Sequence, residues 1–247
     1  MYPAFVTVRT SSTRLPRKCF LSFRGKTVLE HIVDRCILFS LDPIVCTSTN
    51  EDDDQIEELC RVKSINFFRG SERNKLKRWS DCCSHFGLKE FHTVDADDPF
   101  FCGNEVKRSM DLLRAKNLDI VTPSEASMNG AASVGYSIRA SALHQIISSL
   151  PIEHDTEMVS PYIERSTTLR VEQLLAACRN KIFARLTLDY IEDYAMLLAL
   201  VTGVGHDAKC SEIDNFLNQN KYLIETNLFR NADWEKKQKE SILNKSI

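Results

Sequence analysis

Four basic side chains lie within ten residues near the start of the chain: Arg9, Arg14, Arg17 and Lys18. They directly follow Phe5–Val8, a short run typical of a buried strand. Ligands of open α/β sheets bind beyond the carboxyl ends of the strands, and guanidinium and ammonium groups bind phosphate oxygens through charge-assisted hydrogen bonds. The pattern predicts a phosphate-binding loop, with a solvated basic loop or an acid-poor transit peptide as alternatives. A transit peptide is disfavoured because strand, loop and helix follow one another without a boundary.

A group of aspartates follows another expected strand, Phe91–Val94. Asp95 and Asp97 are two residues apart, so in an extended chain they share one face while Asp98 points away. Carboxylates at a strand end suit Mg²⁺, which binds one or two of them together with phosphate oxygens of a substrate. The alternative is a polar turn before Pro99.

A third acidic group, Asp189, Glu192 and Asp193, follows the expected last strand Ile182–Leu188. Carboxylates at two strand ends and a basic loop at a third can converge on one crevice. That combination is typical of metal-assisted phosphoryl chemistry.

The elements that must position these side chains alternate regularly in the first half of the chain. Further strands are expected at 43–47, 65–68 and 119–122, and helices at 28–37, 74–86 and 104–116. Asn50 is expected to cap the helix that begins with the acidic run at residue 51. The alternation predicts an α/β domain with a mostly parallel sheet, a less regular region after residue 123, and a polar, helical tail.

The composition excludes several functional classes. A net charge of −2 in 247 residues gives no reason to expect a nucleic acid or an anionic membrane as partner, and no apolar run is long enough to span a bilayer. Eight glycines are about half the usual share, and none forms a dinucleotide-binding or P-loop pattern. Nine cysteines without CxxC spacing predict reduced thiols and a cytoplasmic location rather than a zinc cluster or disulfides.

Residues 9–18 resemble the RxxSxRLPxK loop of the CMP-sugar synthetase (acylneuraminate cytidylyltransferase) superfamily, with the closest likeness to its SpsF-like branch of spore coat polysaccharide biosynthesis. Five further segments resemble family motifs in the same order. They are Gly25–Glu30 (GKPxLE), Phe68–Glu72 (FRGSE), Ala96–Pro99 (GDxP), Glu153–Ile163 (EHVTPYI) and Arg185–Asp193 (RLTVDTPED). The likeness extends over about residues 4–201.

The resemblance implies a role for each matching residue. Lys18, Arg9 and Arg14 would hold the phosphates of CTP and neutralise the departing pyrophosphate. Nucleotide contacts are implied for Ser12, Ser71 and Arg78, and Mg²⁺ coordination for Asp97 and Asp189. The implied reaction is in-line attack of an acceptor oxygen on the α-phosphorus of CTP, which gives a CMP conjugate and pyrophosphate.

Five features depart from the family pattern. Arg17 and Ala96 replace glycines, Thr93 stands where an arginine is common, and Tyr136 lies near the place of a glutamate in the acceptor region. The segment Arg73–Leu76 after the FRGSE turn lacks the acidic residue often found there. These changes concern the acceptor more than the nucleotide chemistry.

The expected fold is a three-layer α/β/α, nucleotide-diphospho-sugar transferase-like (Rossmann-like) fold with a mostly parallel sheet. It forms one domain over residues 1–247, with 123–180 as acceptor and dimerisation region and 206–247 as a helical C-terminal tail. The expected protein is a homodimeric cytidylyltransferase of surface glycan biosynthesis that acts on an acidic sugar, a nonulosonate or a 3-deoxy-octulosonate. Alternatives are a phosphonate or phosphorylated alditol acceptor, a sugar-1-phosphate or molybdopterin nucleotidyltransferase, and a non-catalytic nucleotide-binding relative.

Overall fold

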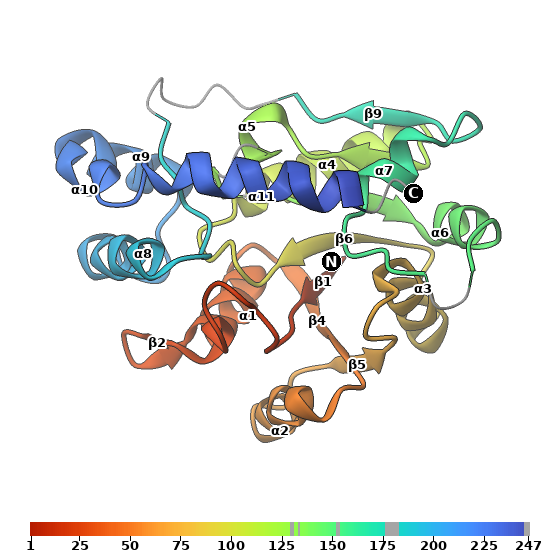
Figure 1. The fold of residues 1–247 in the computed structure, drawn as a ribbon, viewed down its shortest axis with the longest axis horizontal. Helices are drawn as coiled ribbons and strands as arrows, with labels where there is room; N and C mark the ends of the chain where they lie inside the picture. The colour runs from red at the N-terminus through yellow and green to blue at the C-terminus, as the bar shows by residue number, and fades with distance from the viewer. Residues whose placement is uncertain (129–130, 133, 152–153, 176–182, 245–247) are drawn as a thin grey trace.

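A twisted central sheet organises the molecule (Figure 1). The computed structural model describes residues 1–128, 131–132, 134–151, 154–175 and 183–244. Within these ranges seven strands form one sheet in the order β5-β4-β1-β6-β8-β7-β9. The strands are β1 Tyr2–Thr7, β4 Leu41–Ser48, β5 Phe67–Gly70, β6 Glu90–Asp95, β7 Ile120–Thr122, β8 Ser137–Arg139 and β9 Val171–Gln173. Only β8 runs antiparallel to its neighbours among these described strands, which confirms the prediction of a mostly parallel sheet.

Alternate residues of the central strands enter two separate hydrophobic cores, one on each face of the sheet. Val6 and Val45 belong to one core, whereas Phe5 and Ile44 belong to the other. The first face is covered by helices α1 Val28–Leu38, α2 Asp54–Val62, α4 Gly103–Ala115, α8 Ile191–Val204 and α9 Cys210–Gln219. The second face is covered by α3 Lys75–Phe86, α6 Ala140–Ile147 and α7 Ser160–Glu164. The predicted three-layer α/β/α arrangement is confirmed.

Short polar side chains begin the helices that follow the site-bearing strands. Thr27 and Glu30 form a capping box at the start of α1, because each side chain accepts a hydrogen bond from the other's backbone N–H. The side chain of Asn50 accepts the backbone N–H of Asp52, which confirms the predicted cap. It begins the short 3₁₀ helix Glu51–Asp53 that leads into α2. Asn74 caps α3 in the same way by accepting the N–H of Lys77.

The predicted strand Ile182–Leu188 is wrong for the residues described, because 183–189 belong to no strand and Ile182 lies outside the described ranges. The segment is buried from Ala184 onward, and a short buried apolar run has no periodicity that distinguishes a strand from other buried chain. The sheet position beside β7 is taken by β9 instead. The segment contacts the turn after β6 through the carbonyl of Asp97, which accepts hydrogen bonds from Leu188 N–H at 2.6 Å and from the hydroxyl of Thr187 at 3.5 Å.

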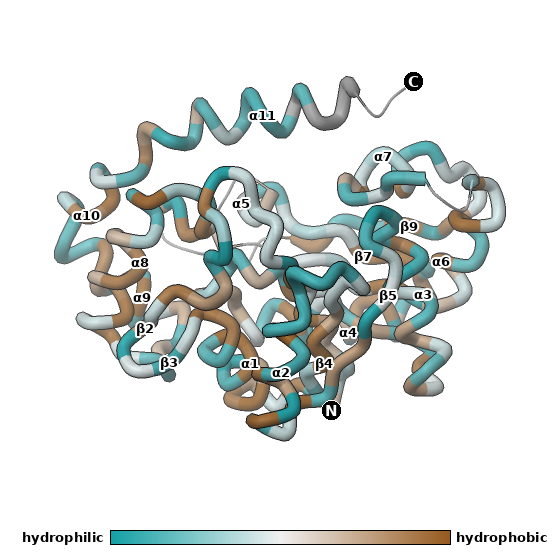
Figure 2. The backbone as a smooth tube through the Cα atoms, turned by 60° about the horizontal axis from the view of Figure 1, so that its bottom comes forward, coloured by the Kyte–Doolittle hydropathy of each residue, from teal (hydrophilic) through white to brown (hydrophobic). Residues whose placement is uncertain are grey.

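The remaining elements are small or peripheral. A hairpin of β2 Ser22–Phe23 and β3 Lys26–Thr27 follows the 3₁₀ turn Lys18–Phe20, and α5 Glu125–Met128 follows β7. The tail contains α9, α10 Lys221–Glu225 and α11 Arg230–Asn244. In Figure 2, α11 is a mainly hydrophilic rod that runs along the outside of the molecule, from the side of α10 toward α7. None of the helices in the described ranges has the length and apolar character that crossing a membrane requires.

His92 on β6 is predicted to make stability depend on pH. The ring is fully buried between Ser137 Oγ and the carbonyl of Val134. Burial lowers the pKa of His92 to about 4. In the unfolded chain His92 takes up a proton near pH 6.5, whereas in the folded chain it stays neutral until about pH 4. The free energy of unfolding should therefore fall as the pH drops below about 6.5. Between pH 7 and 5 the loss from this ring should be about 2 kcal/mol.

Urea unfolding at several pH values checks this expectation in the wild type and in His92→Asn. The variant should lose part of its stability at pH 7 because a buried hydrogen-bonded ring is removed. Its decline between pH 7 and 5 should be shallower than that of the wild type by about 2 kcal/mol. Parallel declines in the two proteins would show that His92 is not the group responsible.

Candidate active site

The basic loop leaves the carboxyl end of β1 and is anchored by one buried carboxylate. Asp53 Oδ1 accepts hydrogen bonds from the backbone N–H and the hydroxyl of Thr10, each at 2.8 Å. Its other oxygen accepts the hydroxyl of Ser48 at 2.5 Å. Burial raises the pKa of Asp53, but the hydrogen bonds from Ser48 and Thr10 outweigh it and hold the pKa below its usual value. An ionised Asp53 therefore fixes the loop against the end of β4.

Arg17 explains one departure from the family pattern. Its backbone is left-handed, with φ of 56°, a conformation that glycine adopts without strain. Its guanidinium stacks over Phe20 at 5.6 Å and donates a hydrogen bond to Gln55. The side chain therefore lies on the outer surface of the loop, and the bulky cation is accommodated there.

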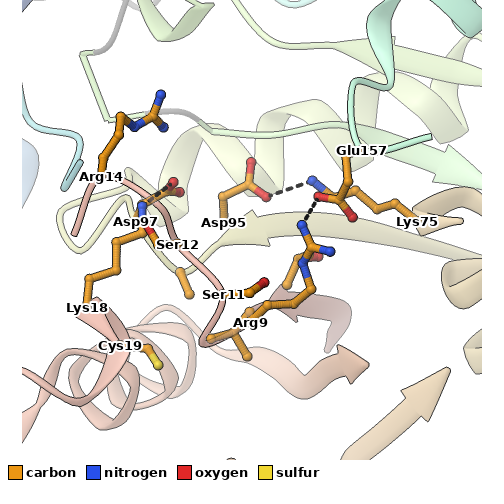
Figure 3. Close-up of a pocket in the computed structure, with 13 residues that line it drawn as sticks. Arg9, Ser11, Ser12, Arg14, Lys18, Cys19, Lys75, Asp95, Asp97 and Glu157 are labelled. Atoms are coloured by element: carbon orange, nitrogen blue, oxygen red, sulfur yellow. Dashed lines mark hydrogen bonds and ion pairs between the residues drawn. The ribbon is translucent and has the colours of Figure 1, made fainter. Parts of the chain in front are cut away.

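A pocket of about 220 Å³ opens between the basic loop and the end of β6 (Figure 3). Five of the residues predicted for the site line it: Arg9, Ser12, Arg14, Lys18 and Asp97. The other lining residues are Thr7, Val8, Ser11, Cys19, Lys75, Asp95, Ala96 and Glu157. Asp189 does not line the pocket but contacts two of the cations that do.

Lys18 joins the two carboxylates predicted to bind a metal. Its Nζ donates to Asp97 Oδ2 at 3.0 Å, to Asp189 Oδ1 at 2.8 Å and to the carbonyl of Leu188 at 2.7 Å. Burial lowers the pKa of Lys18, but Asp97 and Asp189 outweigh it and raise the pKa above its usual value. Three oxygens from two separate segments therefore surround one positive charge.

Asp189 is almost fully buried and is held as a carboxylate by its neighbours. Arg14 Nη2 lies 2.7 Å from Asp189 Oδ1, the same oxygen that Lys18 contacts. Burial raises the pKa of Asp189, but Lys18 and Arg14 outweigh it and hold the pKa below its usual value. The sequence pattern predicted that these carboxylates and the basic loop converge, and Lys18 and Arg14 do contact Asp189, although the strand expected before Asp189 does not form in the described residues.

The oxygen atoms at this point fit a hard divalent cation. Asp97, Asp189 and the Leu188 carbonyl already surround a cationic nitrogen, and carboxylate and carbonyl oxygens are the ligands that Mg²⁺ prefers. Asp98 adds to the acidic group: one oxygen of each of Asp95, Asp97 and Asp98 lies within 4.8 Å of the others. The prediction that Asp98 points away is therefore wrong, because the chain turns directly after β6 and is no longer extended.

A second ionic cluster lies on the other side of the pocket. Arg9 Nη2 contacts Glu157 Oε2 at 2.9 Å, and Lys75 Nζ lies 3.6 Å from Asp95 Oδ1 (Figure 3). Burial raises the pKa of Asp95, and Lys75 opposes that shift. Lys75 and Glu157 were not predicted as site residues. Their signals were available: Lys75 follows the Phe68–Glu72 motif, and Glu157 lies inside the Glu153–Ile163 motif, of which Glu153 is outside the described residues.

Ser71 and Arg78 lie behind the pocket lining instead of on it. The fully buried Arg78 donates from Nη1 to the carbonyls of Ser71 at 2.6 Å and Glu72 at 3.2 Å. Ser71 Oγ accepts the backbone N–H of Asn74 at 3.1 Å. Glu72 in turn presents its carbonyl to Arg9 Nη1 at 3.0 Å. The two residues thus hold the turn against which Arg9 rests.

Thr93 on β6 and Tyr136, which directly precedes β8, are joined by two hydrogen bonds. Thr93 Oγ1 accepts the backbone N–H of Tyr136 at 2.8 Å, and Thr93 N–H donates to the carbonyl of Tyr136 at 2.8 Å. Gly135 makes this approach possible, since a Cβ there would lie 2.0 Å from the carbonyl oxygen of Thr93. Thr93 is buried in this contact, so it presents no charge where the family commonly has an arginine.

The sequence model of the cytidylyltransferase family matches residues 4–224. The chain belongs to this family. This cytidylyltransferase is 28% identical over 227 residues to the spore coat polysaccharide biosynthesis protein SpsF of Bacillus subtilis, covering 87% of the chain and 93% of SpsF. It is 26% identical over 201 residues to an uncharacterized protein of Methanocaldococcus jannaschii, covering 79% of the chain and 81% of that protein.

Solved structures share the fold. A cytidylyltransferase from Leptospira borgpetersenii matches with a TM-score of 0.81 and 21% identity, over 91% of this chain and 97% of that one. CMP:2-keto-3-deoxy-manno-octonic acid synthetase, solved with CTP, matches with a TM-score of 0.64 and 14% identity, over 82% and 99%. Rv0371c from Mycobacterium tuberculosis, solved with manganese, matches with a TM-score of 0.55 and 16% identity, over 81% and 99%. The predicted family, fold and nucleotidyltransferase class are confirmed.

The anchoring role of Asp53 gives a prediction for this cytidylyltransferase. In Asp53→Asn an amide nitrogen replaces one carboxylate oxygen, so at least one donor among Thr10 and Ser48 loses its acceptor. We expect the free energy of unfolding to fall by about 1–3 kcal/mol. We also expect the KM for CTP to rise several-fold with a smaller change in kcat, because the loop loses its anchor. Steady-state kinetics and urea unfolding measure both effects.

Asp52→Asn is the matched control, since Asp52 is the preceding residue and is exposed. It should leave the KM for CTP unchanged. An equal rise in both variants would show that local charge, and not the anchor, governs nucleotide binding.

Proposed function

We propose that this chain transfers the cytidylyl group of CTP to an acidic sugar, of the nonulosonate or 3-deoxy-octulosonate type, and releases pyrophosphate. The observation that carries the proposal is the position of Lys18 Nζ between Asp97 and Asp189. It places an ammonium group and two carboxylates together beside a pocket that Lys18, Asp97, Arg9 and Arg14 line and Asp189 does not. The family match, SpsF and the CTP complex of the octonic acid synthetase support the choice of nucleotide.

The cationic side chains would bind the phosphates of CTP, and the carboxylates would bind the divalent cation. Arg9, Arg14 and Lys18 would neutralise the triphosphate, and Ser12 would contact it from the same loop. Asp97 and Asp189 would hold Mg²⁺, which when bound supplies further neutralisation of phosphate charge. The acceptor hydroxyl oxygen would attack the α-phosphorus in line and release its proton to solvent. The new P–O bond would form as the bond to the bridging oxygen breaks, and the pyrophosphate would leave with that electron pair. Positioning and charge neutralisation would provide most of the rate enhancement.

Two other acceptor classes and a homodimeric assembly belong to the same proposal. A phosphonate or a phosphorylated alditol would use the same nucleotide chemistry, and the uncharged Thr93 in place of an arginine favours including both in any substrate screen.

We propose a homodimer in contact through residues 123–180. The exposed apolar side chains of Val171 and Leu175, on and just after the edge strand β9, support this choice. Light scattering of the purified chain measures the mass directly.

One experiment separates the proposed function from its rivals. The purified protein is incubated with Mg²⁺, each of CTP, UTP, GTP and ATP, and a panel of acidic sugars, phosphonates and alditol phosphates. Pyrophosphate release and the mass of the conjugate are measured. We expect turnover with CTP and an acidic sugar. Preference for another nucleotide would support the sugar-1-phosphate or molybdopterin alternative. Thermal stabilisation by CTP without turnover would support a non-catalytic relative.

A further inference from the structure

The segment that carries Asp189 lacks the support that a sheet would give it. Residues 183–189 form no strand in the described structure, and Leu188 gives the segment one backbone hydrogen bond to the turn after β6. A carboxylate proposed to share a cation with Asp97 nevertheless needs a fixed position, because coordination geometry depends on where the ligands lie. The support must come from other parts of the chain.

A buried ion pair fixes the backbone at Asp189. Arg185 and Asp193 are both fully buried and form a two-point contact, with Nε to Oδ1 at 2.8 Å and Nη2 to Oδ2 at 3.0 Å. Asp193 Oδ2 also accepts the backbone N–H groups of Asp189 at 2.9 Å and Tyr190 at 3.0 Å. The position of the Asp189 backbone therefore depends on the position of the Asp193 carboxylate.

The C-terminal tail completes this ion pair. Asn227, fully buried between α10 and α11, donates from Nδ2 to Asp193 Oδ1 at 2.9 Å and to the carbonyl of Arg185 at 3.0 Å. Arg185 Nη1 donates to Asn231 Oδ1 at 3.3 Å, and the Arg185 guanidinium stacks over Trp234 at 5.7 Å. A buried ion pair is favourable only when its remaining donors and acceptors are satisfied. The tail supplies those partners from the far end of the sequence.

A second contact of the tail reaches the residues beside Asp189. Arg230 binds Glu192 through Nη2 at 2.8 Å and Nε at 3.1 Å, and its guanidinium stacks over the ring of Tyr190 at 4.9 Å. Tyr190 follows Asp189 directly, and Arg14 of the basic loop lies over the same ring at 5.8 Å. The start of α11 and the basic loop thus meet across one side chain.

We propose that the C-terminal tail is part of the active site, with Asn227 as a positioning residue that holds Asp189 through Asp193. The proposal rests on the proposed function in one respect, the assignment of Asp189 as a ligand of the divalent cation. It assigns a role in metal binding to a residue that lies outside every motif shared with the family.

Asn227→Ala in the full chain tests this role, with Mn²⁺ as probe, CTP present and no acceptor. Mn²⁺ binding is followed by water proton relaxation, which requires no turnover. We expect Mn²⁺ affinity to fall at least 10-fold, the range that loss of a partner of a metal ligand produces. Hydrogen exchange at the amides of Asp189 and Tyr190 should accelerate in the metal-free protein. The Kd for CTP at saturating Mn²⁺ should change less than twofold, because Asp53 anchors the phosphate loop separately.

Tyr222→Ala is the matched control. Tyr222 lies on α10, is 65% exposed, and its hydroxyl donates to Asn220 only among the described contacts. The control should bind Mn²⁺ like the wild type. Asn231→Ala removes one acceptor of Arg185 at a less buried position and serves if Asn227→Ala does not fold; it should weaken Mn²⁺ binding in the same direction.

The outcomes separate this proposal from the proposed function. Unchanged Mn²⁺ affinity and unchanged amide exchange in a folded Asn227→Ala or Asn231→Ala would overturn the role of the tail, even in an active enzyme. An equal loss of affinity in Tyr222→Ala would overturn it too. A wild type that binds Mn²⁺ in a tail-dependent manner, but transfers no cytidylyl group to any acceptor, would overturn the proposed function and support the tail's role.

Discussion

Asp97→Asn is expected to lower kcat by about three orders of magnitude or more while the fold is retained. Asp97 is about one-third exposed at the pocket, and it contacts Lys18, so the substitution removes charge without opening a cavity. A neutral amide leaves one carboxylate, Asp189, to hold the divalent cation. Charge stabilisation by such a cation contributes several kcal/mol to phosphoryl chemistry, and each 1.4 kcal/mol corresponds to about a tenfold change in rate.

Pyrophosphate release at increasing Mg²⁺ measures this effect, and circular dichroism checks the fold. Asp81→Asn is the matched control, because Asp81 forms a comparable pair with Lys77 at 2.5 Å on the exposed face of α3. It should leave kcat unchanged. Undiminished turnover in Asp97→Asn would show that Asp97 is not a metal ligand. Asp95 and Asp98, which lie in the same acidic group, would then be the candidate ligands to test.

Lys18→Ala is expected to reduce kcat/KM for CTP by about 30- to 1,000-fold, or about 2–4 kcal/mol, which is comparable to losing one preorganised electrostatic donor. The structure adds a second expectation. Without the ammonium group, Asp97 loses its ion pair with Lys18, and among the described residues Asp189 keeps only its ion pairs with Arg14 and Arg185. The variant should therefore be destabilised in the absence of divalent cations. Mg²⁺ should restore its melting temperature by more than it raises that of the wild type.

Thermal unfolding with and without Mg²⁺ and steady-state kinetics in CTP measure the two effects. Lys18→Arg separates charge from shape, since a planar guanidinium cannot occupy the point between three oxygens that a compact ammonium occupies. Lys26→Ala, which removes an exposed pair with Asp34, is the control. An unchanged kcat/KM for CTP in Lys18→Ala would contradict the proposed role of the basic loop in binding the CTP phosphates.

Local sequence patterns were sufficient to predict structure where the residues that surround a position in space also lie close to it in the chain. The strand before the basic loop, the cap at Asn50 and the carboxylates after β6 all follow from neighbours within a few residues. The pocket's five predicted lining residues belong to two such local groups, and the rule that ligands bind beyond the carboxyl ends of strands brings those groups together.

The predictions failed where position depends on distant parts of the chain. Residues 184–189 are buried and contact the tail and the turn at Asp97, so the apolar run there has the same pattern as a strand. Asp98 joined the acidic group because the chain turns directly after β6. Glu157 reaches the pocket because Arg9 and the buried Arg78 both bind it, and that contact joins segments 79 or more residues apart.

The pocket's opposite charges carry a kinetic consequence. Its four cations and the carboxylates that face them are equal in number: Arg9 with Glu157, Arg14 and Lys18 with Asp189 and Asp97, and Lys75 with Asp95. A neutral cleft generates little long-range attraction for a polyanion. The association rate of the nucleotide should therefore depend only weakly on ionic strength, and selection should occur after encounter, when each arginine exchanges an internal carboxylate for a phosphate oxygen.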